Sequence, residues 1–144
     1  MIATVTMNPC IDKTLTIRGF SYGGLNRVQT KRSDFSGKGI NVSIVLNQLG
    51  IPVRTFGINY TKNGQDFSKG LETLGIHYEA YMAEGAVREN IKVMNEEDRV
   101  TTELNQKGDP LDAKTIRAFT DQLMEQLSDP EIEMVVITGS VPQG

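Results

Sequence analysis

The chain has one cysteine, one histidine and no tryptophan among its 144 residues. A single thiol, Cys10, cannot form an internal disulfide, which excludes the disulfide-stapled secreted folds. The net charge is only −3, with both signs interspersed, so the basic surface that nucleic acids and anionic membranes require is missing. There is also no signal peptide and no long apolar run. These absences favour a cytoplasmic protein of one ordinary domain with a small metabolite as its ligand.

Signatures of metal sites and of common nucleophiles are missing as well. Neither HExxH nor CxxC occurs, so we expect no metal held by protein ligands. His77 has no partner motif, and we expect it to be structural or exposed rather than catalytic. Cys10 lacks a recognisable base and is expected to be a small packed hydrophobe. We therefore predict no catalytic residue of these kinds in this chain.

Apolar periodicity alternates between strand and helix patterns along most of the sequence. Asp112 is the expected N-cap of the last helix, while Gly50 and Gly75 are the expected stops of the first two. The expected strands are 2–7, 53–58, 76–81 and 134–138, and the expected helices are 39–49, 67–74 and 116–127. This alternation predicts an α/β fold with a doubly wound, mostly parallel sheet, extending over 1–144 as one domain.

Two segments interrupt this alternation. Residues 14–32 and 88–104 are too polar and too regularly alternating for buried parallel strands, and Glu96–Asp98 has the composition of a hairpin turn. We expect them to form a separate, half-exposed sheet whose strands lie within about 13–33 and 87–104. A small sheet inserted at the carboxyl edge of an α/β domain could act as a lid over a ligand.

The segment Ser36–Ser43 is a glycine-rich loop that continues into an apolar-periodic helix. It brings backbone N–H groups, a cation and an amide together, which suits a polar or anionic ligand. It does not match the nucleotide P-loop, because Arg32 replaces the first glycine and Gly39 replaces the hydroxyl residue. It does not match the dinucleotide fingerprint either, because Val42 replaces the last glycine.

Four motifs occur in an order that resembles the ribokinase-like sugar kinases. The resemblance is greatest to the phosphofructokinase B branch, and within it to the N-terminal part of the 1-phosphofructokinases and tagatose-6-phosphate kinases. The motifs extend over essentially the whole chain and are Asn8-Pro9-Cys10-Ile11-Asp12, the loop Ser36–Asn41, Arg88-Glu89-Asn90-Ile91-Lys92, and Thr138-Gly139-Ser140-Val141-Pro142-Gln143-Gly144.

The resemblance implies roles for five residues of the first two motifs. Asp12 would accept hydrogen bonds from sugar hydroxyls, and Asn41 would donate to and accept from them. Lys38 would meet the substrate phosphate, while Gly37 and Gly39 would let the sugar ring approach the backbone. Without the resemblance, Asp12 reads equally as a turn residue after Asn-Pro, and the loop reads as a glycine-rich turn with a solvated lysine.

The other two motifs add further candidates for substrate binding. Arg88 matches the lid arginine that contacts the sugar phosphate in similar kinases, and Asn90 and Lys92 share its face of the strand. Arg27 is a weaker phosphate candidate on the other lid segment, and Ser140 lies in a turn near the expected site. The alternative is an ordinary solvated strand face and a turn-forming serine.

The sequence also departs from this family. Ser36 stands where the family usually has glycine, and serine tolerates most turns but not a relaxed φ > 0. The Gly-Ala-Gly-Asp segment that supplies the catalytic base and anion hole does not occur. Because phosphoryl transfer depends on positioning and charge stabilisation, we expect the chain by itself to be inactive.

The resemblance therefore implies that 1–144 is an incomplete ribokinase-like α/β domain, with the function of the acceptor-binding part of a kinase. The parent reaction would be ATP-dependent phosphorylation of fructose 1-phosphate to fructose 1,6-bisphosphate, with Mg²⁺ accompanying ATP and with most of the ATP pocket outside this chain. Tagatose 6-phosphate is the alternative acceptor. Two other functions compete with this one. The chain could be a non-catalytic sugar-phosphate-binding or interaction module, or a structural remnant without a ligand. The resemblance also implies a homodimer formed through the lid sheet.

Overall fold

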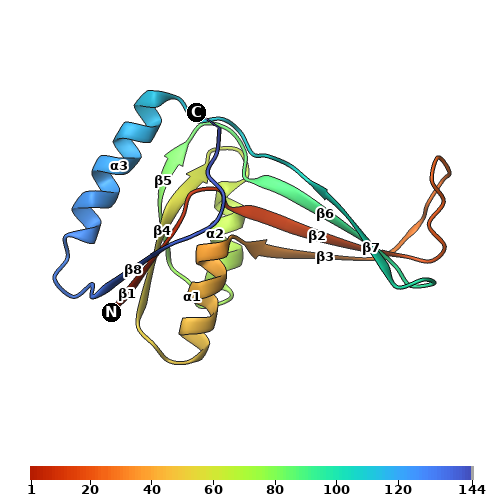
Figure 1. Ribbon diagram of the computed structural model, residues 1–144, viewed down its shortest axis with the longest axis horizontal. Helices are drawn as coiled ribbons and strands as arrows, with labels where there is room; N and C mark the ends of the chain where they lie inside the picture. Colours follow the sequence, from red (N-terminus) through yellow and green to blue (C-terminus); the bar gives the residue numbers. More distant parts are fainter. Residues whose placement is uncertain (144) are drawn as a thin grey trace.

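The computed structural model describes residues 1–143, so Gly144 of the terminal motif lies outside the described residues. The described chain forms two four-stranded sheets and three helices (Figure 1). The core sheet has the order β5-β4-β1-β8, and the lid sheet has the order β3-β2-β6-β7. The strands are β1 (Ile2–Thr6), β2 (Cys10–Ile17), β3 (Val28–Ser36), β4 (Val53–Tyr60), β5 (Tyr78–Ala83), β6 (Arg88–Asn95), β7 (Val100–Asn105) and β8 (Met134–Ile137), and the helices are α1 (Lys38–Gln48), α2 (Gly64–Glu72) and α3 (Ala113–Leu127).

All pairings in the core sheet are parallel, which confirms the predicted α/β class. Helices α1 and α2 lie on one side of this sheet and α3 lies on the other (Figure 1). The core is built on apolar side chains that these layers bury, among them Phe56, Phe67, Leu71 and Phe119. The ring of Phe67 contacts Tyr78 edge to face, with ring centroids 5.9 Å apart. The unbroken runs of buried residues in β1 (Ala3–Thr6) and β4 (Thr55–Tyr60) are typical of strands covered on both faces.

Helices α1 and α2 both end at glycines, as predicted. Gly50 and Gly75 have φ values of 71° and 75°, in the left-handed region that glycine adopts readily. After each glycine the next N–H donates back into the last helical turn, from Ile51 to Leu46 and from Ile76 to Leu71. Ile76 therefore belongs to the stop of α2, and β5 begins two residues later than the predicted strand.

Helix α3 begins at the predicted N-cap. The Asp112 side chain accepts a hydrogen bond from the Thr115 N–H at 2.6 Å. This bond lowers the pKa of Asp112, because it stabilises the charged carboxylate. A local signal therefore located this helix start correctly.

The lid sheet is separate from the core sheet and projects away from it (Figure 1). Its two hairpins, β2–β3 and β6–β7, are antiparallel and join through the parallel pair β2–β6. The strands extend beyond the predicted limits of 13–33 and 87–104, since β2 begins at Cys10, β3 ends at Ser36 and β7 ends at Asn105. The extra residues carry the strands up to the carboxyl edge of the core sheet.

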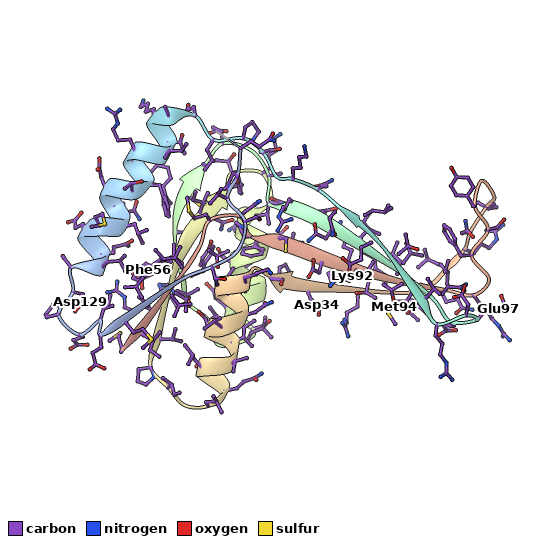
Figure 2. The ribbon with its side chains drawn as sticks, viewed as in Figure 1. Asp34, Phe56, Lys92, Met94, Glu97 and Asp129 are labelled. Atoms are coloured by element: carbon purple, nitrogen blue, oxygen red, sulfur yellow. The ribbon has the colours of Figure 1, made fainter. Side chains whose placement is uncertain are left out.

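The two faces of the lid sheet differ in polarity. Register places Asp12, Thr14, Asn90 and Lys92 on one side, with Asp34 and Glu103 on the flanking strands, and we call this the polar face. The opposite side carries Leu15, Ile91, Val93, Val100 and Leu104, which we call the apolar face. It is bordered by Lys31 and by the Lys13–Glu89 ion pair. Figure 2 shows Asp34 and Lys92 on the projecting strands.

Strand β8 forms an apolar edge of the core sheet. Met134, Val135 and Ile137 are 57%, 41% and 65% exposed. Successive strand residues point to opposite faces, so β8 is uncovered on both faces among the described residues. This differs from β1 beside it, where Ala3 and Val5 are buried. The exposed edge is a surface at which the chain could associate with other protein.

Every helix in the described part of the chain is too short or too polar to span a bilayer.

Candidate functional site

A pocket of about 340 Å³ opens at the carboxyl edge of the core sheet. Four parts of the fold meet there: the end of β1, the start of α1, the start of β6 and the turn after β8. This is the edge at which open α/β sheets bind ligands. The pocket brings together three predicted site residues, Lys38, Arg88 and Ser140, and is completed by Thr6, Asn8, Thr138 and Gly139.

Arg88 is the cation at the base of the lid. Its Nη1 donates to the Gln106 carbonyl at 3.0 Å and to Asn90 Oδ1 at 3.4 Å, and its Nη2 lies 3.4 Å from the Asn8 carbonyl. Its Nε is buried and has no partner among the described residues. No carboxylate of the described chain forms an ion pair with it. Neutral oxygens hold the guanidinium in place without neutralising it, so the pocket can accept an anion.

Asp12 lies next to this pocket on the polar face. Asn90 Nδ2 donates to Asp12 Oδ1 at 2.9 Å, and Lys92 Nζ lies 3.4 Å from Oδ2. The predicted shared face of Arg88, Asn90 and Lys92 is thus present, with Asp12 as its acceptor. Asn90 and Lys92 hold the carboxylate oriented, while Oδ2 can still accept another hydrogen bond.

Cys10 lies beside Asp12, with Sγ 3.7 Å from Oδ1. Burial raises the pKa of this thiol, the nearby Asp12 raises it further, and Arg88 opposes the shift. The thiol stays protonated at neutral pH, which agrees with its expected role as a packed side chain.

Asn8 takes part in the site, although the sequence analysis gave it no role beyond its place in the first motif. Its Nδ2 donates to the Lys107 carbonyl at 2.9 Å and to Ser140 Oγ at 3.1 Å. Its Oδ1 is buried without a partner among the described residues, and a Cβ on Gly108 would lie 2.6 Å from it. Asn8 therefore ties the segment after β7 to the turn after β8. The Asn-Pro dipeptide was the available signal, but these partners are about 100 or more residues away.

Packing against β1 explains why residues 37 and 39 are glycines, which the sequence did not reveal. A Cβ on either residue would lie 2.6 Å from a side-chain atom of Thr6 on β1. Both missing Cβ atoms therefore face the protein interior, where they allow the loop to close on β1. Their predicted contact with a sugar ring stays a prediction. Ser36 ends β3, and Arg99 is the only non-glycine residue with positive φ in the described chain, so serine is tolerated at that position.

Two predicted residues lie away from the pocket. Asn41 is exposed on α1, accepts a hydrogen bond from Ser36 Oγ at 3.2 Å, and lines a separate hollow of about 400 Å³ beside β3. Arg27 is exposed in the loop that joins β2 to β3. That loop begins after Ile17, five residues along β2 from Asp12, which corresponds to about 17 Å of extended chain. The structure therefore does not bring Arg27 to the other candidates.

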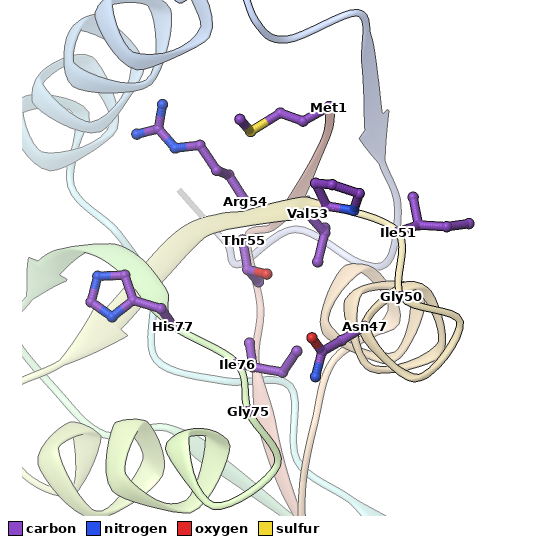
Figure 3. A pocket seen from close by; sticks show the side chains of 11 residues that line it. Met1, Asn47, Gly50, Ile51, Val53, Arg54, Thr55, Gly75, Ile76 and His77 are labelled. Carbon is purple, nitrogen blue, oxygen red and sulfur yellow. The ribbon is translucent and has the colours of Figure 1, made fainter.

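The opposite edge of the core sheet has its own pocket, of about 460 Å³ (Figure 3). His77 is exposed there, as predicted. Arg54 lines the same pocket but is fully paired, because its Nη2 donates to Glu79 at 2.6 Å and its Nη1 to Asp129 at 2.9 Å. This arginine is already neutralised, in contrast to Arg88.

The described residues around the candidate site do not fit a nucleotide-bound Mg²⁺. No group of three His, Cys, Asp or Glu side chains in residues 1–143 could hold a metal ion. Asp109, on the segment between β7 and α3, accepts a hydrogen bond from the Ala86 N–H at 2.9 Å. A nucleotide-bound Mg²⁺ takes one or two protein carboxylates together with phosphate oxygens and waters. The carboxylates here, Asp12 and Asp109, are both already held by hydrogen bonds from the protein. We assign neither ATP nor Mg²⁺ to residues of this chain.

The comparisons with known proteins agree with the motifs. The chain matches no protein-family profile. It is 32% identical over 146 residues to a 1-phosphofructokinase of Rhodobacter capsulatus, covering 99% of this chain and 45% of that protein. A possible 1-phosphofructokinase from Thermotoga maritima superposes with a TM-score of 0.87 at 32% identity, covering 100% of this chain and 46% of that one.

A more distant structure shares the fold alone. Phosphofructokinase-2 from Escherichia coli in complex with fructose-6-phosphate has a TM-score of 0.86 at 22% identity, covering 98% of this chain and 46% of that one. The chain thus spans less than half the length of these relatives. The resemblance to ribokinase-like kinases of the phosphofructokinase B branch is confirmed, and with it the ribokinase-like fold.

Proposed function

We propose that this chain is the acceptor-binding part of a kinase resembling the 1-phosphofructokinases, and that it binds a ketohexose phosphate at the 340 Å³ pocket. The observation that carries this proposal is Arg88, a partly buried cation with no carboxylate partner among the described residues. A phosphate would supply the missing charge. The preferred acceptor is fructose 1-phosphate, and the reaction of the whole protein would produce fructose 1,6-bisphosphate from it with ATP. The single cysteine and the metabolite ligand favour a cytoplasmic setting.

The residues around the pocket have complementary roles in this proposal. Arg88 presents its guanidinium fork to phosphate oxygens, and Lys38 at the start of α1 adds a second positive charge. Asp12 accepts hydrogen bonds from sugar hydroxyls, while Asn90 and Lys92 fix its orientation. Ser140 and the backbone of the turn after β8 close the pocket. These residues bind and orient the acceptor, but none of them is proposed as the base that removes the hydroxyl proton.

Calorimetric titration of the purified chain tests the proposed function. We expect fructose 1-phosphate to bind and ATP with Mg²⁺ to give no heat of binding, because the nucleotide has no site here. Tagatose 6-phosphate distinguishes the alternative acceptor, and free fructose controls for the phosphate. A coupled assay with sugar and ATP together should detect no turnover. Binding of ATP, or of neither sugar phosphate, would contradict the proposal.

The proposal includes a homodimer in which the apolar faces of two lid sheets pack together. Val100 and Leu104 on this face are 54% and 57% exposed, and the neighbouring Leu15, Ile91 and Val93 are half-buried. A contiguous apolar patch of this kind marks an association surface. Strand β8 is the competing surface, since Ile137 is 65% exposed.

Light scattering distinguishes the two surfaces. We expect the unaltered chain to have the mass of a dimer and Leu104→Lys to have that of a monomer, because burying a lysine side chain at an apolar interface is costly. Ile137→Lys is the matched control and should remain dimeric. A monomeric unaltered chain, or a dimer that Ile137→Lys dissociates, would show that the lid sheet is not the interface.

A further inference from the structure

Helix α1 begins without a capping side chain of its own. Its N-cap is Gly37, and no side chain at that position can accept a hydrogen bond from the first turn. Thr6 on β1 supplies the missing acceptor, because its Oγ1 accepts a hydrogen bond from the Ile40 N–H at 3.0 Å. This N–H is one of the groups that a helix start leaves without an intrahelical partner. A residue 34 positions away in the sequence therefore caps the helix.

The same side chain shapes the loop in front of the helix. A Cβ on Gly37 would lie 2.6 Å from Thr6 Cγ2, and a Cβ on Gly39 would lie 2.6 Å from Thr6 Oγ1. The two glycines thus close around the methyl and the hydroxyl of one threonine. Lys38 lies between them, and both Lys38 and Thr6 line the 340 Å³ pocket. The backbone that carries Lys38 is therefore held against Thr6 on both sides.

Thr4, two residues earlier on β1, offers a close comparison. It is also fully buried, and its Oγ1 lies 2.6 Å from Ser43 Oγ in the next turn of α1. Ser43 in turn donates to the Gly39 carbonyl at 3.3 Å and accepts from Thr55 at 2.8 Å. Thr4 thus fastens the body of α1 to the core sheet, but it does not line the pocket.

We propose that Thr6 is a positioning residue for acceptor binding, which caps α1 from the neighbouring strand and fixes the Gly37–Asn41 turn so that Lys38 faces the pocket. This inference rests on the proposed function for its ligand. It assigns to Thr6 a role in binding that differs from the structural role of Thr4, although both hydroxyls connect β1 to the same helix.

The test compares Thr6→Val, Thr6→Ser and Thr4→Val by two measurements. Amide hydrogen exchange followed by NMR reports the capping bond directly, and calorimetry with fructose 1-phosphate reports binding. In Thr6→Val, which keeps the shape but loses the hydroxyl, we expect exchange at Ile40 to accelerate about tenfold and the affinity to fall by roughly five- to tenfold. Thr6→Ser restores the hydroxyl and should bind within about twofold of the unaltered chain. Thr4→Val should lower the unfolding midpoint without changing the exchange rate at Ile40 or the affinity for fructose 1-phosphate.

The two measurements separate failure of this inference from failure of the proposed function. If the unaltered chain binds no sugar phosphate, the proposed function is wrong, and exchange at Ile40 alone decides whether Thr6 fixes the turn. Equal exchange in Thr6→Val and the unaltered chain, or equal loss of affinity in Thr6→Val and Thr4→Val, overturns the inference. If Thr6→Val does not fold, hydrogen exchange in the unaltered chain still tests the inference. The Ile40 amide must then exchange more slowly than the amides of Lys38 and Gly39. Similar exchange rates at the three amides would overturn the inference.

Discussion

Replacing Gly57 with alanine should strongly destabilise the fold. A Cβ at this position would lie 2.1 Å from the Thr6 carbonyl oxygen and 2.3 Å from the Tyr78 hydroxyl. Neither group can move freely, because Thr6 is paired with Gly57 in the core sheet and the Tyr78 hydroxyl donates to the Ile58 carbonyl at 2.8 Å. Burial also raises the pKa of Tyr78, so its hydroxyl stays protonated and keeps donating at any ordinary pH.

The expected cost is about 4 kcal/mol or more, which is a large part of the 5–15 kcal/mol that stabilises a typical domain. Urea unfolding followed by circular dichroism measures it. Gly50→Ala is the matched control: Gly50 has a φ of 71°, but a Cβ added there would meet no heavy atom within 4 Å. That variant should lose only about 1–2 kcal/mol, from backbone strain alone. If both variants had the same unfolding midpoint, the close approach at Gly57 would not limit stability.

The elements that sequence analysis predicted correctly depend on local signals. Gly50, Gly75 and Asp112 end or begin helices through contacts within a few residues, so their types and spacing were sufficient. The lid strands also followed from their alternation of polar and apolar residues. Their limits did not, because the pairing of Cys10 with Ser36 depends on a partner 26 residues away. Strand ends that tertiary pairing sets carry no local signal.

The candidate site was predictable in its residue types but less so in its arrangement. Lys38, Arg88 and Ser140 meet at one pocket because the carboxyl ends of β1 and β8 and the start of β6 lie together. Arg27 does not join them, because the hairpin extends away from the site. Gly37 and Gly39 were assigned to a ligand, whereas their missing Cβ atoms face Thr6. A glycine in a sequence indicates that a side chain would not fit at that position, but it does not indicate which neighbouring atoms would clash with it.

Replacing Arg88 with methionine should lower the affinity for fructose 1-phosphate at least 100-fold. The guanidinium would make charge-assisted hydrogen bonds to the phosphate, worth about 1.5–3 kcal/mol each, and methionine keeps the bulk of the side chain without the charge. Arg88→Lys should recover only part of the affinity. The planar guanidinium can donate to the Asn8 and Gln106 carbonyls and to a phosphate at the same time, whereas a lysine ammonium group cannot. Calorimetric titration of each variant with fructose 1-phosphate gives the dissociation constants.

Arg88 also joins the lid to the core, so its loss should lower stability, and the two effects must be separated. Its Nη1 and Nη2 donate to the Gln106 and Asn8 carbonyls, which lie on two of the segments that connect the sheets. Arg54→Met is the matched control, because Arg54 pairs with Glu79 and Asp129 at the opposite edge of the core sheet. It should reduce the unfolding free energy while leaving the affinity within about twofold, since the pair is remote from the pocket. An Arg88→Met variant that binds fructose 1-phosphate as the unaltered chain does would remove the basis for placing the phosphate at this pocket.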